Sequence, residues 1–68
     1  MEKTELLRYK DKRVQAKFRD GSLIKTAEGI LKEVGDGFAK ITGRKGTIIL
    51  NQGSIIKIKE ETDSQYTL

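Results

Sequence analysis

Apolar residues fall into five short runs, and glycine-bearing turns separate one run from the next. The runs are Val14–Arg19, Leu23–Val34, Phe38–Thr42, Thr47–Leu50 and Ser54–Lys59. In the first run apolar and polar side chains alternate, which is the period of a strand with one buried face. Evenly spaced runs with turns between them predict a mainly β fold, in which five antiparallel strands form a strongly bent small barrel.

The chain reads as a single domain with a short helix in front of the barrel. Residues 2–10 are compatible with a helix of two to three turns, and we place the helix within residues 1–11, the barrel at 13–60 and a flexible tail at 61–68. Alternation breaks in the second run near residues 26–29, where glycine permits a bulge or sharp bend. Residues 51–53 predict a tight or 3₁₀ turn.

The last two strands carry aliphatic residues at consecutive positions, in Ile48–Leu50 and again in Ile55–Ile58. Such runs are typical of strands that are covered on both faces, whereas a small barrel has only one interior. Either the N-terminal helix covers the outer face and the protein is a monomer, or a second copy does. Because bare apolar edges pair readily with other chains, we expect a homo-oligomer joined through these two strands.

Composition narrows the function classes. The 68 residues contain 14 Lys and Arg against 10 Asp and Glu, without cysteine or histidine. Thiolate and imidazole chemistry is therefore excluded, no carboxylates have the spacing of a coupled pair, and we expect neither an enzyme nor a cofactor. No apolar stretch has the length of a membrane span, and the lack of cysteine favours a cytoplasmic protein. The basic excess lies in residues 1–19, which carry seven basic and three acidic side chains.

Three stretches resemble the Sm-like family of small barrels, including its bacterial Hfq branch. Residues 7–14 resemble the basic helix end that enters strand one in Hfq. Asp20-Gly21, Gly29–Leu31 and Asp36–Ile41 resemble the first Sm motif, and Gln52–Ile58 resembles the second. The chain departs from the family at four points. The segment from Gly21 to Gly29 is longer, and Lys40 stands where Sm proteins have asparagine. Gln52 stands where the second motif has a basic residue, and the Lys-His pair of Hfq is absent. Other SH3-like barrels share the same five-strand outline.

The resemblance implies an RNA site with three residues. Phe38 would stack on a base, while Lys40 and Gln52 would line a central pore as a cation and an amide donor. Each also has a structural reading: Phe38 as a core residue, Lys40 as an exposed strand lysine and Gln52 as a turn residue.

A basic cluster near the N-terminus is the second candidate. Arg8, Lys10, Lys12 and Arg13 surround Tyr9 and would grip phosphates on an outer rim. A solvated helix end has the same appearance. The tip Gly43–Gly46 is basic too, but we interpret it as a turn.

The sequence thus predicts an oligomeric protein that binds single-stranded RNA through a pore and a basic rim. The alternative is an SH3-like protein-interaction or assembly module that does not bind nucleic acid. Binding of double-stranded DNA has less support, because no recognition helix is visible.

Overall fold

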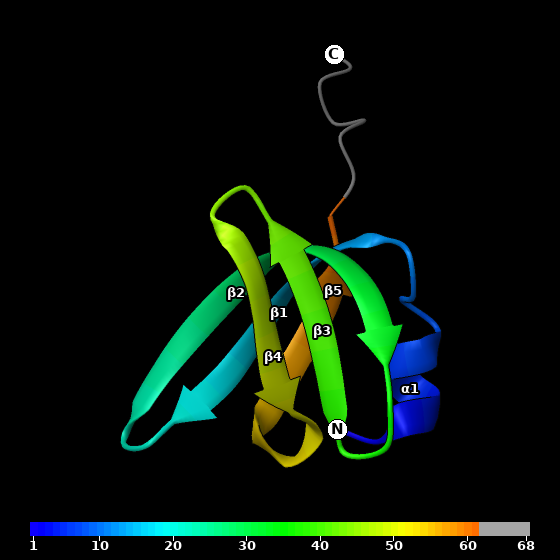
Figure 1. Cartoon of the computed structure of the whole chain (residues 1–68). Coiled ribbons are helices and arrows are strands. Elements are labelled where there is room, and N and C mark those ends of the chain that lie inside the picture. The colour runs from blue at the N-terminus through cyan, green and yellow to red at the C-terminus, as the bar shows by residue number, and fades with distance from the viewer. Residues whose placement is uncertain (62–68) are drawn as a thin grey trace.

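A short helix precedes five strands in the computed structural model, which describes residues 1–61 (Figure 1). The elements are α1 (Lys3–Leu7), β1 (Arg13–Asp20), β2 (Leu23–Val34), β3 (Phe38–Gly43), β4 (Gly46–Asn51), the 3₁₀ turn η1 (Gln52–Ser54) and β5 (Ile55–Glu60). The mainly β fold class is confirmed, each strand boundary lies within one residue of its predicted run, and the 3₁₀ turn is where the sequence places it.

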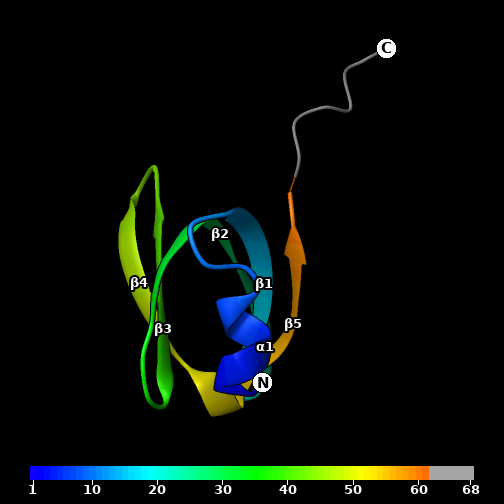
Figure 2. The same cartoon turned by 90° about the vertical axis from the view of Figure 1, so that its right-hand side faces the viewer.

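All five strands belong to one antiparallel sheet with the order β4-β3-β2-β1-β5. The long strand β2 joins the two halves: its first part pairs with β1 and its last part with β3. Figure 2 shows the consequence, with β3 and β4 on one side and β1 and β5 on the other. The edge strands β4 and β5 do not pair with each other, so the sheet is strongly bent but is not closed into a barrel.

Gly29 marks the bend in β2. Its φ is +156°, a value that residues with a side chain rarely adopt, and a Cβ at this position would collide with the backbone of Thr42. The predicted irregularity at residues 26–29 is therefore found as a bend. The register shift lies slightly later, between Leu31 and Glu33, where β2 pairs with β3.

The core lies inside the bend and is formed by alternate residues of the strands. The side chains of Val14, Ala16 and Phe18 in β1 point inward, as the alternation predicts. The other buried apolar residues are Leu6, Ala27, Leu31, Val34, Ala39, Ile41, Leu50, Ile55 and Ile58. Leu6 is fully buried and is the one residue of the helix that packs into the core.

The helix is shorter than predicted and has only five residues. No side chain caps its N-terminus. After Leu7 the chain forms turns, Asp11 adopts a positive φ of 68°, and its backbone N–H donates to the carbonyl of Leu31. Five residues are too few for an independent helix, so packing on the sheet sets where it ends.

The consecutive aliphatics of the last two strands are covered on one face only. Ile49 is 62% exposed and Ile56 is 50% exposed, whereas Leu50 and Ile58 are buried. Both isoleucines are exposed although the helix is packed on the sheet, so the helix does not cover them. Within the chain, the described residues leave both edge strands with exposed apolar side chains.

The sequence predicts neither a membrane span nor an ordered C-terminal tail. No helix within residues 1–61 combines the length and apolarity that crossing a membrane requires. Of the predicted tail, Glu61 donates its backbone N–H to the carbonyl of Arg13, and residues 62–68 lie outside the described part of the chain.

Candidate functional site

The turn between β2 and β3 is clamped by Gln52. The side-chain Nε2 of Gln52 donates to the carbonyl oxygens of Gly35 at 2.6 Å and Phe38 at 2.9 Å. Its backbone N–H donates to the carbonyl of Gly37 at 2.9 Å. Two of the three predicted RNA-binding residues, Phe38 and Gln52, are therefore in direct contact, and the amide that was expected to meet RNA holds the turn.

Phe38 starts β3 and is half-buried. Its ring lies over Gly35, since a Cβ at that glycine would collide with the ring carbons. It does not belong to the cluster of buried core residues. One side of the Phe38 ring therefore packs against the backbone of Gly35, and the residue remains partly exposed to solvent.

Lys40 lies two positions after Phe38 and therefore on the same face of β3. Its Nζ is 3.2 Å from Glu33 Oε1 on the neighbouring strand, and its side chain is 37% exposed. Across the other neighbour it faces Ile49 of β4. An aromatic ring, an ammonium group and an exposed isoleucine thus share the outer surface of β3 and β4.

The N-terminal basic cluster lies elsewhere, on the connection between α1 and β1 at the opposite end of the fold from the β2–β3 turn (Figure 1). Three of its four members have carboxylate neighbours: Lys10 with Asp11 at 3.3 Å, Lys12 with Glu60 at 3.6 Å, and Arg13 with Glu61 at 3.8 Å. Such exposed pairs contribute little to stability and leave the cations accessible. The structure therefore separates the predicted rim residues from the predicted pore residues.

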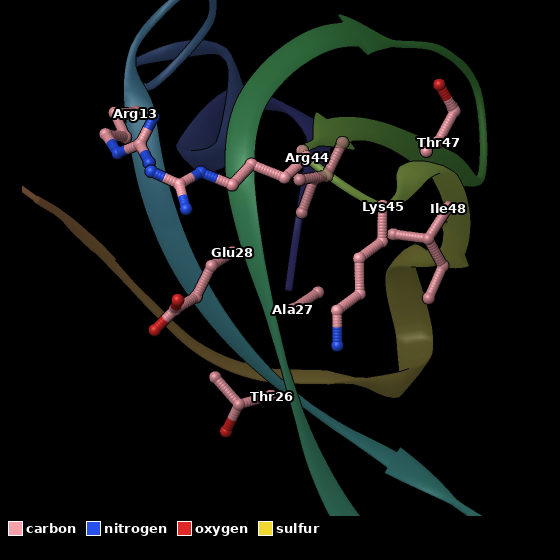
Figure 3. A pocket seen from close by; sticks show the side chains of 11 residues that line it. Arg13, Thr26, Ala27, Glu28, Arg44, Lys45, Thr47 and Ile48 are labelled. Carbon is pink, nitrogen blue, oxygen red and sulfur yellow. The ribbon is translucent and has the colours of Figure 1, made fainter.

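A basic depression that the sequence analysis missed lies next to Arg13. Arg44 and Lys45 at the tip of the β3–β4 hairpin line it together with Arg13, and Ala27 and Ile48 add apolar surface (Figure 3). Its volume is about 670 Å³. The sequence shows the two basic residues of the tip, but only the close backbone approach of Gly43 to Glu28 across the bend brings them to this place.

Asp36 in the same β2–β3 turn is paired with the helix. Lys3 Nζ donates to Asp36 Oδ1 at 2.9 Å, and this hydrogen bond, together with the positive charge of Lys3, lowers the pKa of Asp36 below its ordinary value. Both side chains are largely exposed. The pair therefore ties the helix to the turn without creating a buried charge.

Among residues 1–61, no three histidine, cysteine or carboxylate side chains converge as metal ligands would. The buried side chains of that part of the chain are all apolar. The chemistry that the described surface offers is that of cations, carboxylates, amides and two partly exposed aromatic rings, Phe38 and Tyr9.

No protein-family model, curated protein or solved structure matches the chain. The function is therefore argued from the surface itself.

Proposed function

We propose that the protein binds single-stranded RNA and self-associates through its edge strands. The observation that carries the proposal is the pairing of Phe38 and Lys40 on one outer face of β3. A base that stacks on an accessible ring places its phosphates within reach of a nearby cation, which is the common arrangement of proteins that bind single strands. The resemblance to Sm-like proteins is part of the same proposal.

The clamp by Gln52 supports this reading. Its hydrogen bonds hold the carbonyls of Gly35 and Phe38, so the turn that carries the ring is fixed before RNA arrives. A ring that is already ordered loses less conformational entropy on binding. In this reading Gln52 contributes by positioning Phe38, and it retains a free carbonyl oxygen on its side chain as an acceptor.

Self-association is supported by the two unpaired edges of the sheet. β4 exposes Ile48 and Ile49, and β5 exposes Ile56, in addition to the free backbone groups of both strands. Edge strands pair readily with a further strand where neither charge nor proline blocks them. β4 has neither, and β5 has no proline but carries Lys57 and Lys59 on its outer face. In the proposed assembly β4 of one copy pairs with β5 of the next.

Fluorescence anisotropy with labelled oligo(U) and oligo(A) tests RNA binding. Phe38→Leu keeps an apolar side chain but removes the stacking face, so we expect affinity to fall about 5- to 150-fold, as loss of ~1–3 kcal/mol per stacked base implies. Lys40→Gln should weaken binding as well. Lys25→Gln is its matched control, because Lys25 is also an exposed strand lysine with a carboxylate partner, Asp20 at 2.7 Å. Equal affinities for all four proteins would refute the site.

The alternative function is an assembly module without nucleic acid, and the exposed isoleucines on the edges favour it independently. Light scattering after size-exclusion chromatography measures self-association separately from oligonucleotide binding. Ile49→Lys should dissociate the assembly, whereas Leu23→Lys should not, because Leu23 is equally exposed (59%) but lies at the start of β2. Association without any oligonucleotide binding would leave the assembly module as the function. A wild-type monomer would refute the association.

A further inference from the structure

Three lysines gather on the outer face of β1 and β5, away from Phe38, Lys40 and Gln52. In the antiparallel ladder Lys17 lies directly opposite Lys57, and Gln15 lies directly opposite Lys59. Their inward neighbours Ala16 and Ile58 are buried, so these four side chains stand on the outside. Together they line a small depression of about 80 Å³. We call this set the β1–β5 lysine face.

The face places like charges opposite each other without a nearby acid. Directly opposed charges of the same sign destabilise a sheet. Within residues 1–61 no carboxylate lies within ion-pair distance of these lysines. Lys32 and Lys45 lack such a partner too, but only Lys17 and Lys57 are opposed to each other in a strand ladder. A repulsive pair on a small domain is the arrangement expected where a ligand supplies the negative charge.

Gln15 keeps the nearest carboxylate away from the lysines. Its Nε2 donates to Glu28 Oε2 at 2.6 Å, on the side that faces β2. The amide thereby lies between Glu28 and the opposed Lys59. The next outward residue toward β2 from Lys17 is the uncharged Thr26, and the next outward residue along β1 is Arg19, so the face remains strongly positive.

We infer that the β1–β5 lysine face binds the phosphate backbone of a nucleic acid strand, as a second contact surface that rests on the proposed RNA-binding function. Along β5, Lys57 and Lys59 are two residues apart, roughly 6.8 Å at the usual rise of a strand. This linear spacing matches a chain of successive phosphates better than a single anion. The contact is electrostatic and carries no base specificity.

The face points away from Phe38 and Lys40. β3 and β4 lie on one side of the bent sheet and β1 and β5 on the other (Figure 2). A strand of RNA held at one surface does not occupy the other. The chain therefore offers one surface with an aromatic ring and one with lysines alone, and the two can be removed independently.

The test measures anisotropy of labelled oligo(U) and oligo(A) over a series of salt concentrations with the full chain. In Lys17→Gln/Lys57→Gln we expect the salt dependence of log K to weaken by roughly 1.4, since each phosphate contact on a single strand contributes about 0.7. The loss at 0.05 M salt relative to 1 M is then about 60-fold and equal for both sequences. The melting temperature of this variant should not fall, because a repulsion is removed.

The matched control is Lys25→Gln/Lys32→Gln, which removes the same charge from two exposed lysines outside both proposed surfaces. It should change the slope of log K against log salt by less than the ~0.7 expected for one phosphate contact. A slope that changes equally in both double variants would reduce the effect to net charge and overturn the inference. Loss of binding in Phe38→Leu alone would overturn the lysine face and leave the proposed site. Loss of binding in Lys17→Gln/Lys57→Gln, with unchanged binding in Phe38→Leu, would overturn the proposed site at Phe38 and leave the lysine face. Binding to phosphatidylserine vesicles without oligonucleotide binding would overturn both.

Discussion

Replacing Gln52 by methionine tests whether its amide is the clamp of the β2–β3 turn. Methionine keeps the length and the apolar stem of the side chain but cannot donate a hydrogen bond. The carbonyl of Phe38 would still accept from the backbone N–H of Gly35 at 3.1 Å. The carbonyl of Gly35 has no other hydrogen-bond partner within residues 1–61, so it would be left unpaired in a half-buried place.

The expected loss follows from these two bonds. An ordinary hydrogen bond contributes ~1 kcal/mol, and a fully buried unpaired carbonyl costs ~1–3 kcal/mol. Because the carbonyl of Gly35 is half-buried, the lower part of that range applies, and Gln52→Met should cost ~2–3 kcal/mol. A domain of this size has a total stability of roughly 3–10 kcal/mol, so the variant should be severely destabilised. Urea unfolding followed by far-ultraviolet circular dichroism measures the difference.

Gln15→Met is the matched control, because its amide makes one exposed hydrogen bond to Glu28. We expect it to cost less than about 1 kcal/mol. If Gln52→Met were no more destabilising than Gln15→Met, the clamp would be refuted and Gln52 would be free to act as an RNA contact. Gln52→Glu tests the same contact through pH. Partial burial and the two facing carbonyls should raise the pKa of the introduced carboxyl in the folded state. The variant should therefore be less stable than the wild type at neutral pH, and this difference should shrink as the pH falls through the folded-state pKa.

Three further results follow from the structure. Gly29→Ala should lower the free energy of unfolding, measured in urea, by ~2–5 kcal/mol, because the bend needs a conformation that favours glycine and the added Cβ would meet backbone atoms. Gly53→Ala is the control and should be nearly neutral, since its Cβ would meet only Asn51 Oδ1 at 3.4 Å. The pKa of Asp36, read by NMR titration, should lie below its ordinary value and return to it in Lys3→Gln; the pair's contribution to stability is therefore present above the unfolded pKa and is lost as the pH falls through the folded pKa. Lys17→Thr should raise stability by ~0.2–1 kcal/mol through relief of the cross-strand repulsion, and a loss of stability would contradict it.

The strands could be predicted because turn-forming residues next to each strand in the sequence set where it begins and ends. Asp20-Gly21 is a strong tight-turn signal, and Gly21 indeed has a positive φ of 65°. Gly37 and Gly46 likewise adopt positive φ at the start of the strands that follow. The alternation of Val14, Ala16 and Phe18 fixes which face of β1 is buried without knowledge of its neighbours.

The candidate site was less predictable because it depends on contacts between distant segments. Gln52 reaches Gly35 across 17 positions, and no local pattern indicates that its amide is already occupied. The extent of the helix was wrong for a similar reason, since the hydrogen bond from Asp11 to Leu31 redirects the chain. The opposition of Lys17 and Lys57 arises only when β5 pairs with β1, forty positions earlier in the sequence.

The proposed association and the lysine face do not compete for the same surface. Strand pairing at β5 uses backbone groups that lie in the plane of the sheet, whereas the side chains of Lys57 and Lys59 stand perpendicular to it. Ile49 is uncharged and can pack beside these lysines of the next copy, whereas Ile49→Lys would place a like charge against them. Pairing of β4 with β5 of the next copy would therefore leave the lysines open and repeat them around the assembly. A modest charge of +4 per chain would then become a continuous basic surface, and affinity for a long strand would rise through multiple contacts. The physical consequence is that Ile49→Lys, which breaks the assembly, should weaken binding of a long oligonucleotide more than that of a short one, even though it adds a positive charge.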